Sequence, residues 1–160
     1  MNRYLCLLLF LFLLPGELLA ACVTPINFNT DVSDSWTSGC TSENRPGSYA
    51  QYYTFTLLSS QEVVVDLESS VDSYLFLLDG SGETGSVIEE DDDSGNTTSS
   101  QITRTLSAGT YTVEATTFGA GITGNFDVSV GISTTSSGEC QNPIIVNTSV
   151  SDIWESGCVS

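Results

Sequence analysis

Carboxylates are the side chains of this 160-residue sequence with the clearest chemical potential. Five of them are consecutive, from Glu89 to Asp93, and Asp72 and Asp79 bracket the apolar run that precedes them. Loop carboxylates and carbonyls are the hard oxygen ligands that calcium binds. The pattern predicts a calcium site drawn from Asp72, Asp79, Glu90, Asp91, Asp92 and Asp93. The alternative is a solvated acidic loop, because the glycine and terminal glutamate of an EF-hand are missing.

Catalysis by a nucleophile has little support in this sequence. Histidine, the usual base that activates a serine or cysteine, is absent. Two carboxylates can hydrolyse a glycosidic bond only when one cleft holds both, whereas the acids here gather in predicted loops. We therefore expect a module that is not an enzyme.

The charge balance excludes several classes of partner. The formal net charge is -17, and only Arg45 and Arg104 are basic beyond the first residues of the chain. Nucleic acids and anionic membranes attract Lys and Arg, so this surface would repel them. We expect each arginine to pair with a nearby carboxylate, and we expect the partner to be an extracellular polymer or surface.

The first 21 residues have the layout of an export signal. Arg3 precedes an apolar run from Tyr4 to Leu14, and the small residues Ala20 and Ala21 end the segment. The apolar run is too short for a membrane-spanning helix, which needs roughly 20 residues. These features predict a protein that is secreted or held at the cell surface, without membrane insertion of the mature chain.

A segment of the chain is duplicated. Residues 22–42 recur without gaps as residues 140–160, and the shared residues include a Trp, a Gly-Cys pair and a Val-Ser-Asp run. This predicts a domain over 22–133, a linker over 134–139 and, over 140–160, the start of a second copy that continues beyond Ser160 in a tandem array. The matched tryptophans, Trp36 and Trp154, are expected to cover the neighbouring cysteines rather than to stack on sugars.

Each copy carries two cysteines at the same spacing. In an exported protein this predicts the disulfides Cys22–Cys40 and Cys140–Cys158. A competing interpretation is that residues 19–22 resemble the lipobox of bacterial lipoproteins, so that Cys22 would carry a lipid anchor. Cys140 follows Gly138 and Glu139 and has no such context, which favours the disulfide.

The remainder of the chain alternates apolar and polar residues with period two, as β-strands do. Seven strands are expected, over residues 49–58, 62–68, 73–79, 86–90, 100–106, 110–117 and 124–133. Asp66, Glu114 and Asp127 fall on the polar side of their strands and are expected to face water. The run 74–78 is apolar throughout, which predicts a strand covered on both faces. The fold class is therefore all-β, a two-sheet antiparallel β-sandwich of jelly-roll type.

The sequence resembles the bacterial pre-peptidase C-terminal domain family. The resemblance rests on the order and spacing of several short motifs, which are YYTFTL at 52–57, DSYLFLLD at 72–79, DDDSG at 91–95, LSAGTYTVE at 106–114 and TGNF at 123–126. It implies a β-sandwich or jelly-roll module that lacks catalytic activity and is attached to secreted peptidases and other exported proteins.

Three functions are consistent with this resemblance. The first is an accessory or adhesion module in a tandem array that helps a larger exported protein attach to a substrate or surface. The second is a structural spacer stiffened by calcium and disulfides. The third is the appendage of a secreted hydrolase, such as a peptidase, whose catalytic domain lies beyond Ser160.

Overall fold

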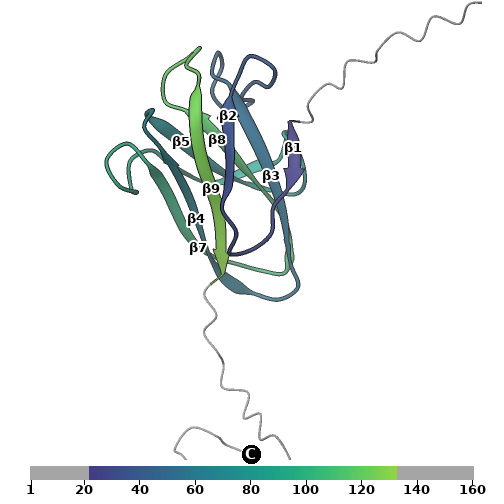
Figure 1. Cartoon of the computed structure of the whole chain (residues 1–160). Coiled ribbons are helices and arrows are strands. Elements are labelled where there is room, and N and C mark those ends of the chain that lie inside the picture. The colour runs from purple at the N-terminus through teal and green to yellow at the C-terminus, as the bar shows by residue number, and fades with distance from the viewer. Residues whose placement is uncertain (1–21, 133–160) are drawn as a thin grey trace, which may run out of the picture.

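The computed structural model of the chain describes residues 22–132, which form a two-layer β-sandwich without helices (Figure 1). No helix in this part of the chain is long and apolar enough to cross a membrane. The all-β prediction is confirmed. The strands are β1 (Val23–Pro25), β2 (Val32–Trp36), β3 (Ala50–Leu57), β4 (Gln61–Ser69), β5 (Ser73–Asp79), β6 (Ser86–Asp91), β7 (Ser100–Leu106), β8 (Gly109–Thr117) and β9 (Gly124–Ile132).

The strands form one five-stranded and one four-stranded sheet. The first sheet has the order β1-β3-β8-β5-β6 and the second has the order β2-β9-β4-β7. All pairs of neighbouring strands are antiparallel except β1 and β3, which are parallel. Consecutive strands lie in different sheets except β5 and β6, which are neighbours in one sheet. The chain therefore crosses repeatedly between the two layers.

Alternate side chains of both sheets fill the space between them. In β4 these are Val63, Val65 and Leu67, all at most 1% exposed, and β9 contributes Phe126 and Val128. Each such side chain stabilises the fold by about 1.5–3 kcal/mol when it is fully buried. The period-two pattern of the sequence therefore corresponds to one continuous core.

A second, smaller apolar cluster lies on the outer face of the five-stranded sheet. It contains Phe76 and Leu78 of β5 together with Ala50 and Tyr52 of β3. Thr41 and the residues after it cross over this face, and the Thr41 carbonyl accepts a hydrogen bond from the Tyr52 hydroxyl at 3.0 Å. This cover explains why β5 is apolar on both sides, as the uninterrupted run 74–78 predicted.

The amino-terminal part of the domain departs from the expectations. Sequence periodicity did not predict β1 and β2, which are short and pair with strands that are distant in the chain. Trp36 is buried, but it stacks on Phe126 in the core between the sheets, with ring centroids 4.4 Å apart. Cys22 instead packs against the outer cluster. The expectation that Trp36 covers the disulfide is therefore wrong.

A disulfide joins Cys22 to Cys40. It ties the start of β1 to the segment that covers the outer face, and it occupies the thiol that the lipid-anchor interpretation requires. The predicted export signal, the linker over 134–139, the second copy and the Cys140–Cys158 disulfide all lie outside the described residues.

Candidate cation site and its surroundings

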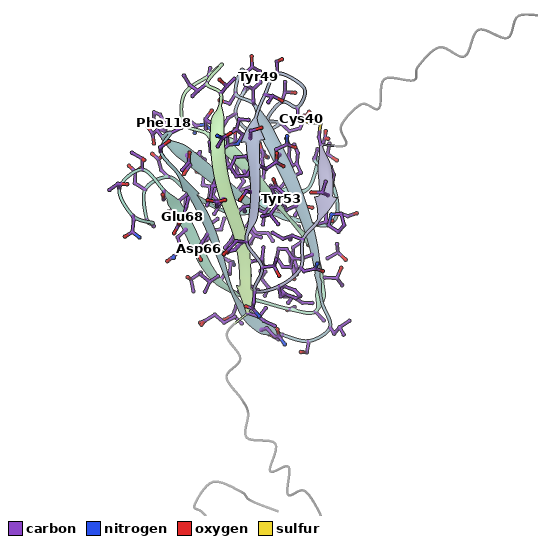
Figure 2. All side chains as sticks on the ribbon, in the orientation of Figure 1. Cys40, Tyr49, Tyr53, Asp66, Glu68 and Phe118 are labelled. Atoms are coloured by element: carbon purple, nitrogen blue, oxygen red, sulfur yellow. A yellow bond between two sulfur atoms is a disulfide. The ribbon has the colours of Figure 1, made fainter. Side chains whose placement is uncertain are left out.

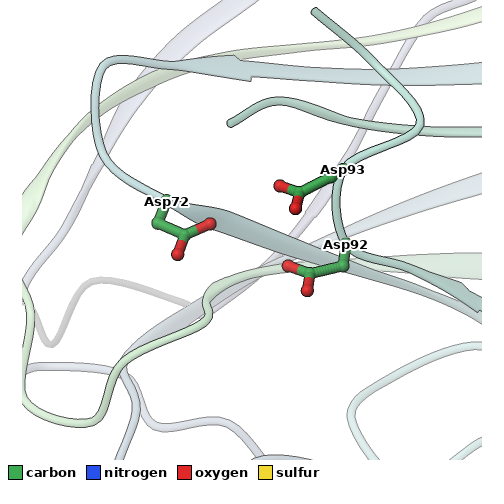
Figure 3. A group of neighbouring side chains, drawn as sticks. All are labelled: Asp72, Asp92 and Asp93. Carbon is green, nitrogen blue, oxygen red and sulfur yellow. The ribbon is translucent and has the colours of Figure 1, made fainter. Parts of the chain in front are cut away.

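Three of the six predicted metal ligands come together at one end of the sandwich. Asp72 immediately precedes β5, while Asp92 and Asp93 follow β6. Because β5 and β6 are antiparallel neighbours, the beginning of one lies beside the end of the other. One carboxylate oxygen of each aspartate lies within 4.8 Å of the others, and Figure 3 shows the three carboxylates facing a common space. We call these residues the aspartate triad.

Asp92 is the unusual member of the triad. Its Oδ1 atom is buried and has no hydrogen-bond partner within the described part of the chain. Burial raises the pKa of the Asp92 carboxyl, and the negative charges of Asp93 and Asp72 raise it further. A carboxylate that has lost water and faces like charges is stabilised by an added cation.

The other three predicted ligands have different positions. Asp91 accepts hydrogen bonds at Oδ2 from the backbone amides of Ser94 and Gln101, at 3.0 and 2.9 Å, and so shapes the loop. Glu90 lies on β6 opposite Phe76. Asp79 ends β5, so the whole strand, about 20 Å long, separates it from Asp72. The interpretation that Asp72 and Asp79 share one ion is therefore wrong, because they flank a single extended strand.

Beside the triad lies a cluster of an arginine and two aromatic rings that the sequence did not predict. The guanidinium carbon of Arg45 lies 3.9 Å from the ring centroid of Tyr74 and 4.8 Å from that of Phe118. Arg45 also donates to the Phe118 carbonyl at 2.6 Å, and the Phe118 amide donates to the Asp72 carbonyl at 3.0 Å. Phe118 is 49% exposed, so this end presents an aromatic ring to solvent (Figure 2).

The two arginines therefore behave differently. Arg104 forms the expected ion pair, with Nη1 2.9 Å from Glu89 Oε2. Arg45 binds a carbonyl and two rings instead of a carboxylate, so the expectation of an ion pair is wrong for this residue. A single sequence could not show this, because Tyr74 and Phe118 lie far from Arg45 in the chain.

The outer face of the four-stranded sheet is acidic and open. Asp66 and Glu68 of β4 lie on it beside Asp127 of β9, in shallow clefts that also contain Ser33 (Figure 2). Asp66 accepts a hydrogen bond from Gln101 and Asp127 accepts one from Ser33, both at 2.5 Å. Asp66 is half-buried, and Glu68 and Asp127 are exposed.

Glu114 lies on the outer face of the other sheet, and its side chain is fully buried. The segment that covers this sheet supplies its partners, since the Ser42 hydroxyl and the Asn44 amide both donate to the carboxylate, the latter at 2.6 Å. Burial raises the pKa of Glu114, and the two hydrogen bonds oppose that rise. The prediction that Glu114 faces water is wrong, because strand alternation cannot show that a loop covers the polar side.

Fold and site together define a β-sandwich module with an acidic surface and three aspartates gathered at one end. Residues 49–117 match the model of the bacterial pre-peptidase C-terminal domain. The resemblance to this family is thereby confirmed, and it supports a non-catalytic accessory module of the kind found in secreted bacterial proteins.

Solved structures agree on the fold. The pre-peptidase C-terminal domain of collagenase from Bacillus anthracis is 15% identical with a TM-score of 0.52, covering 68% of this chain and 93% of that one. PliG from Aeromonas hydrophila, a periplasmic inhibitor of g-type lysozyme, is 17% identical with a TM-score of 0.52, covering 69% and 95%. No curated protein matches the chain significantly.

Proposed function

We propose that this chain is a secreted, non-catalytic attachment module, arranged in tandem, that holds a larger exported protein at an extracellular polymer or surface. The observation that carries the proposal is the arrangement of the two ends of the sandwich. The aspartate triad, Arg45 and the exposed ring of Phe118 share one end, whereas β9 ends at the other (Figure 1). The last described strand therefore ends away from the part of the sandwich that offers charged and aromatic groups to a partner.

Calcium is the proposed cofactor of this end. The triad offers three carboxylates. Within the described part of the chain, the buried Oδ1 atom of Asp92 has no hydrogen-bond partner, so it is available to coordinate the ion. Bound calcium would neutralise the repulsion among the three aspartates and would fix the loop after β6 relative to the start of β5. The role of the ion is thus to order the attachment end rather than to catalyse a reaction.

Polymer sedimentation tests the attachment function. The domain is mixed with insoluble peptidoglycan, chitin, cellulose and collagen, with calcium or with a chelator, and the bound fraction is measured. We expect calcium-dependent retention on at least one polymer and a roughly 5- to 150-fold weaker affinity for Phe118→Ala, since an exposed aromatic contact is worth about 1–3 kcal/mol.

Leu58 provides the matched control. It is 94% exposed and follows β3 at the end of the sandwich opposite to Phe118. Leu58→Ala should bind as the wild type does. Equal binding by the two variants, or no retention on any of the four polymers, would refute the proposed function.

A further inference from the structure

The structure explains which residues of the duplicated segment recur. We call residues 22–42 the first segment, residues 140–160 the second segment and residues 43–132 the body. The buried side chains of the first segment are Ile26, Trp36, Cys40 and Ser42. All four recur in the second segment, as Ile144, Trp154, Cys158 and Ser160. None of the differences between the two segments falls on a buried position.

Recurrence is incomplete at the exposed positions, where six of the eleven residues recur and five do not. Several residues of the first segment that face solvent are replaced in the second, namely Thr24, Asn27, Asp31, Thr37 and Thr41. Recurrence is thus complete at the buried positions and partial at the exposed ones. This is the distribution expected of two segments that fit the same complementary surface.

Several contacts of the recurring residues reach into the body. Trp36 donates from Nε1 to the Ala115 carbonyl at 2.9 Å and stacks on Phe126. Asp34, which recurs as Asp152, accepts from the Tyr53 hydroxyl at 2.8 Å.

Two further recurring residues are polar and have specific roles. Ser42 donates to the buried Glu114, and Asn29 holds a φ of 57°, a left-handed conformation that asparagine tolerates well. A buried serine hydroxyl and a left-handed asparagine both lower the stability of a fold when the groups that they contact are absent.

We propose that the second segment is an interaction element that binds a body of this same fold, and that a second copy of this chain can serve as its partner. The second segment of one molecule would take the place of the first segment on the body of the other, so that Trp154 fills the site of Trp36. The inference does not depend on the proposed attachment function.

Geometry favours exchange between molecules. β9 ends at the opposite end of the sandwich from Cys22 (Figure 1). Residues 133–139 span at most about 28 Å between Ile132 and Cys140, so replacement within one molecule would require a nearly extended connection along the domain. Replacement between molecules has no such requirement.

The test weakens the first segment and leaves the second intact. In the chain without residues 1–21, Trp36→Ala should weaken the binding of the first segment to the body on the order of 10²- to 10³-fold. A tethered segment acts at roughly millimolar effective concentration, so we expect Trp36→Ala to form dimers or larger assemblies at about 100 µM in sedimentation velocity. Trp154→Ala and the double variant should be monomeric.

Two results would overturn the proposal. One is a folded, monomeric Trp36→Ala chain at about 100 µM, and the other is equal association of Trp36→Ala and the double variant. If Trp36→Ala alone is unfolded, an oxidised peptide of residues 140–160 at about 1 mM should restore its β-sheet circular dichroism, whereas a Trp154→Ala peptide should not. Failure of that rescue would equally refute the exchange.

Discussion

Glu114 is a fully buried carboxylate and Asp92 is a half-buried one with a buried Oδ1 atom, and burial raises the pKa of both. The protein treats them differently. Glu114 accepts hydrogen bonds from Ser42 and Asn44, whereas Asp92 Oδ1 has no hydrogen-bond partner among residues 22–132, and the Asp92 carboxylate lies beside those of Asp72 and Asp93. The first carboxylate is satisfied by the fold itself, and the second has the surroundings of a group that needs a cation.

The difference separates a structural acid from a binding acid. Glu114 holds the covering segment against the five-stranded sheet, so we expect its removal to destabilise the domain under all conditions. We expect the aspartate triad to cost stability when calcium is absent and to contribute stability when calcium is bound. The following variants test each half of this comparison.

The largest effect is expected from Glu114→Ala. This change leaves the Ser42 hydroxyl and the Asn44 amide without an acceptor and opens a cavity beneath them. We expect a loss of about 2–4 kcal/mol in the free energy of unfolding, measured by urea denaturation. The exposed Glu68 is the control, and Glu68→Ala should stay within about 0.5 kcal/mol of the wild type. A similar loss in both variants would show that Glu114 has no special structural role.

A smaller effect is expected from pH. The pKa of Glu114 is higher in the folded domain than in the unfolded chain, so its contribution to stability is complete below the usual glutamate pKa and is lost as the pH rises through the raised value. Glu114→Gln removes this titration. The unfolding free energy of the wild type relative to that of Glu114→Gln should therefore fall as the pH rises above the ordinary glutamate pKa of about 4.3. A difference independent of pH would contradict this cause.

The smallest effect, and the one that changes sign, is expected from Asp92→Asn. In a chelator the variant should be more stable than the wild type by about 0.5–1 kcal/mol, because one of three mutually repelling charges is gone. In millimolar calcium it should be less stable, because a ligand is lost. Chemical denaturation under both conditions measures the two differences. If the stability difference between Asp92→Asn and the wild type has the same sign in chelator and in calcium, Asp92 is not distinguished from Glu114 as a binding acid.

Sequence periodicity was sufficient to predict the strands that form the body of the sandwich. β5 and β7 have the predicted bounds, and the all-apolar run in β5 correctly predicted a strand covered on both faces. β1 and β2 were missed because they have only three and five residues, and Asp34 occupies an inward position of β2, where it accepts from the Tyr53 hydroxyl. Their strand character depends on pairing with β3 and β9, which local sequence cannot show.

The site was only partly predictable from the sequence, for a similar reason. Acidic composition suggested six ligands, but only strand pairing shows that Asp72 lies beside Asp92 and Asp93 and far from Asp79. The position of Arg45 against Tyr74 and Phe118 depends on contacts between segments that are distant in sequence. The burial of Glu114 depends on a covering loop, and strand alternation does not detect such loops.

Scanning calorimetry of the domain, with calcium from 0.1 to 10 mM and with a chelator, tests the assignment of the aspartate triad most directly. Calcium at about a hundred times its dissociation constant should stabilise the folded state by about 2.7 kcal/mol and raise the midpoint by roughly 10 °C in a domain of this size. The double variant Asp92→Asn/Asp93→Asn should not respond. An unchanged wild-type midpoint at 10 mM calcium, or an equal rise in the double variant, would contradict the assignment of the triad as a cation site.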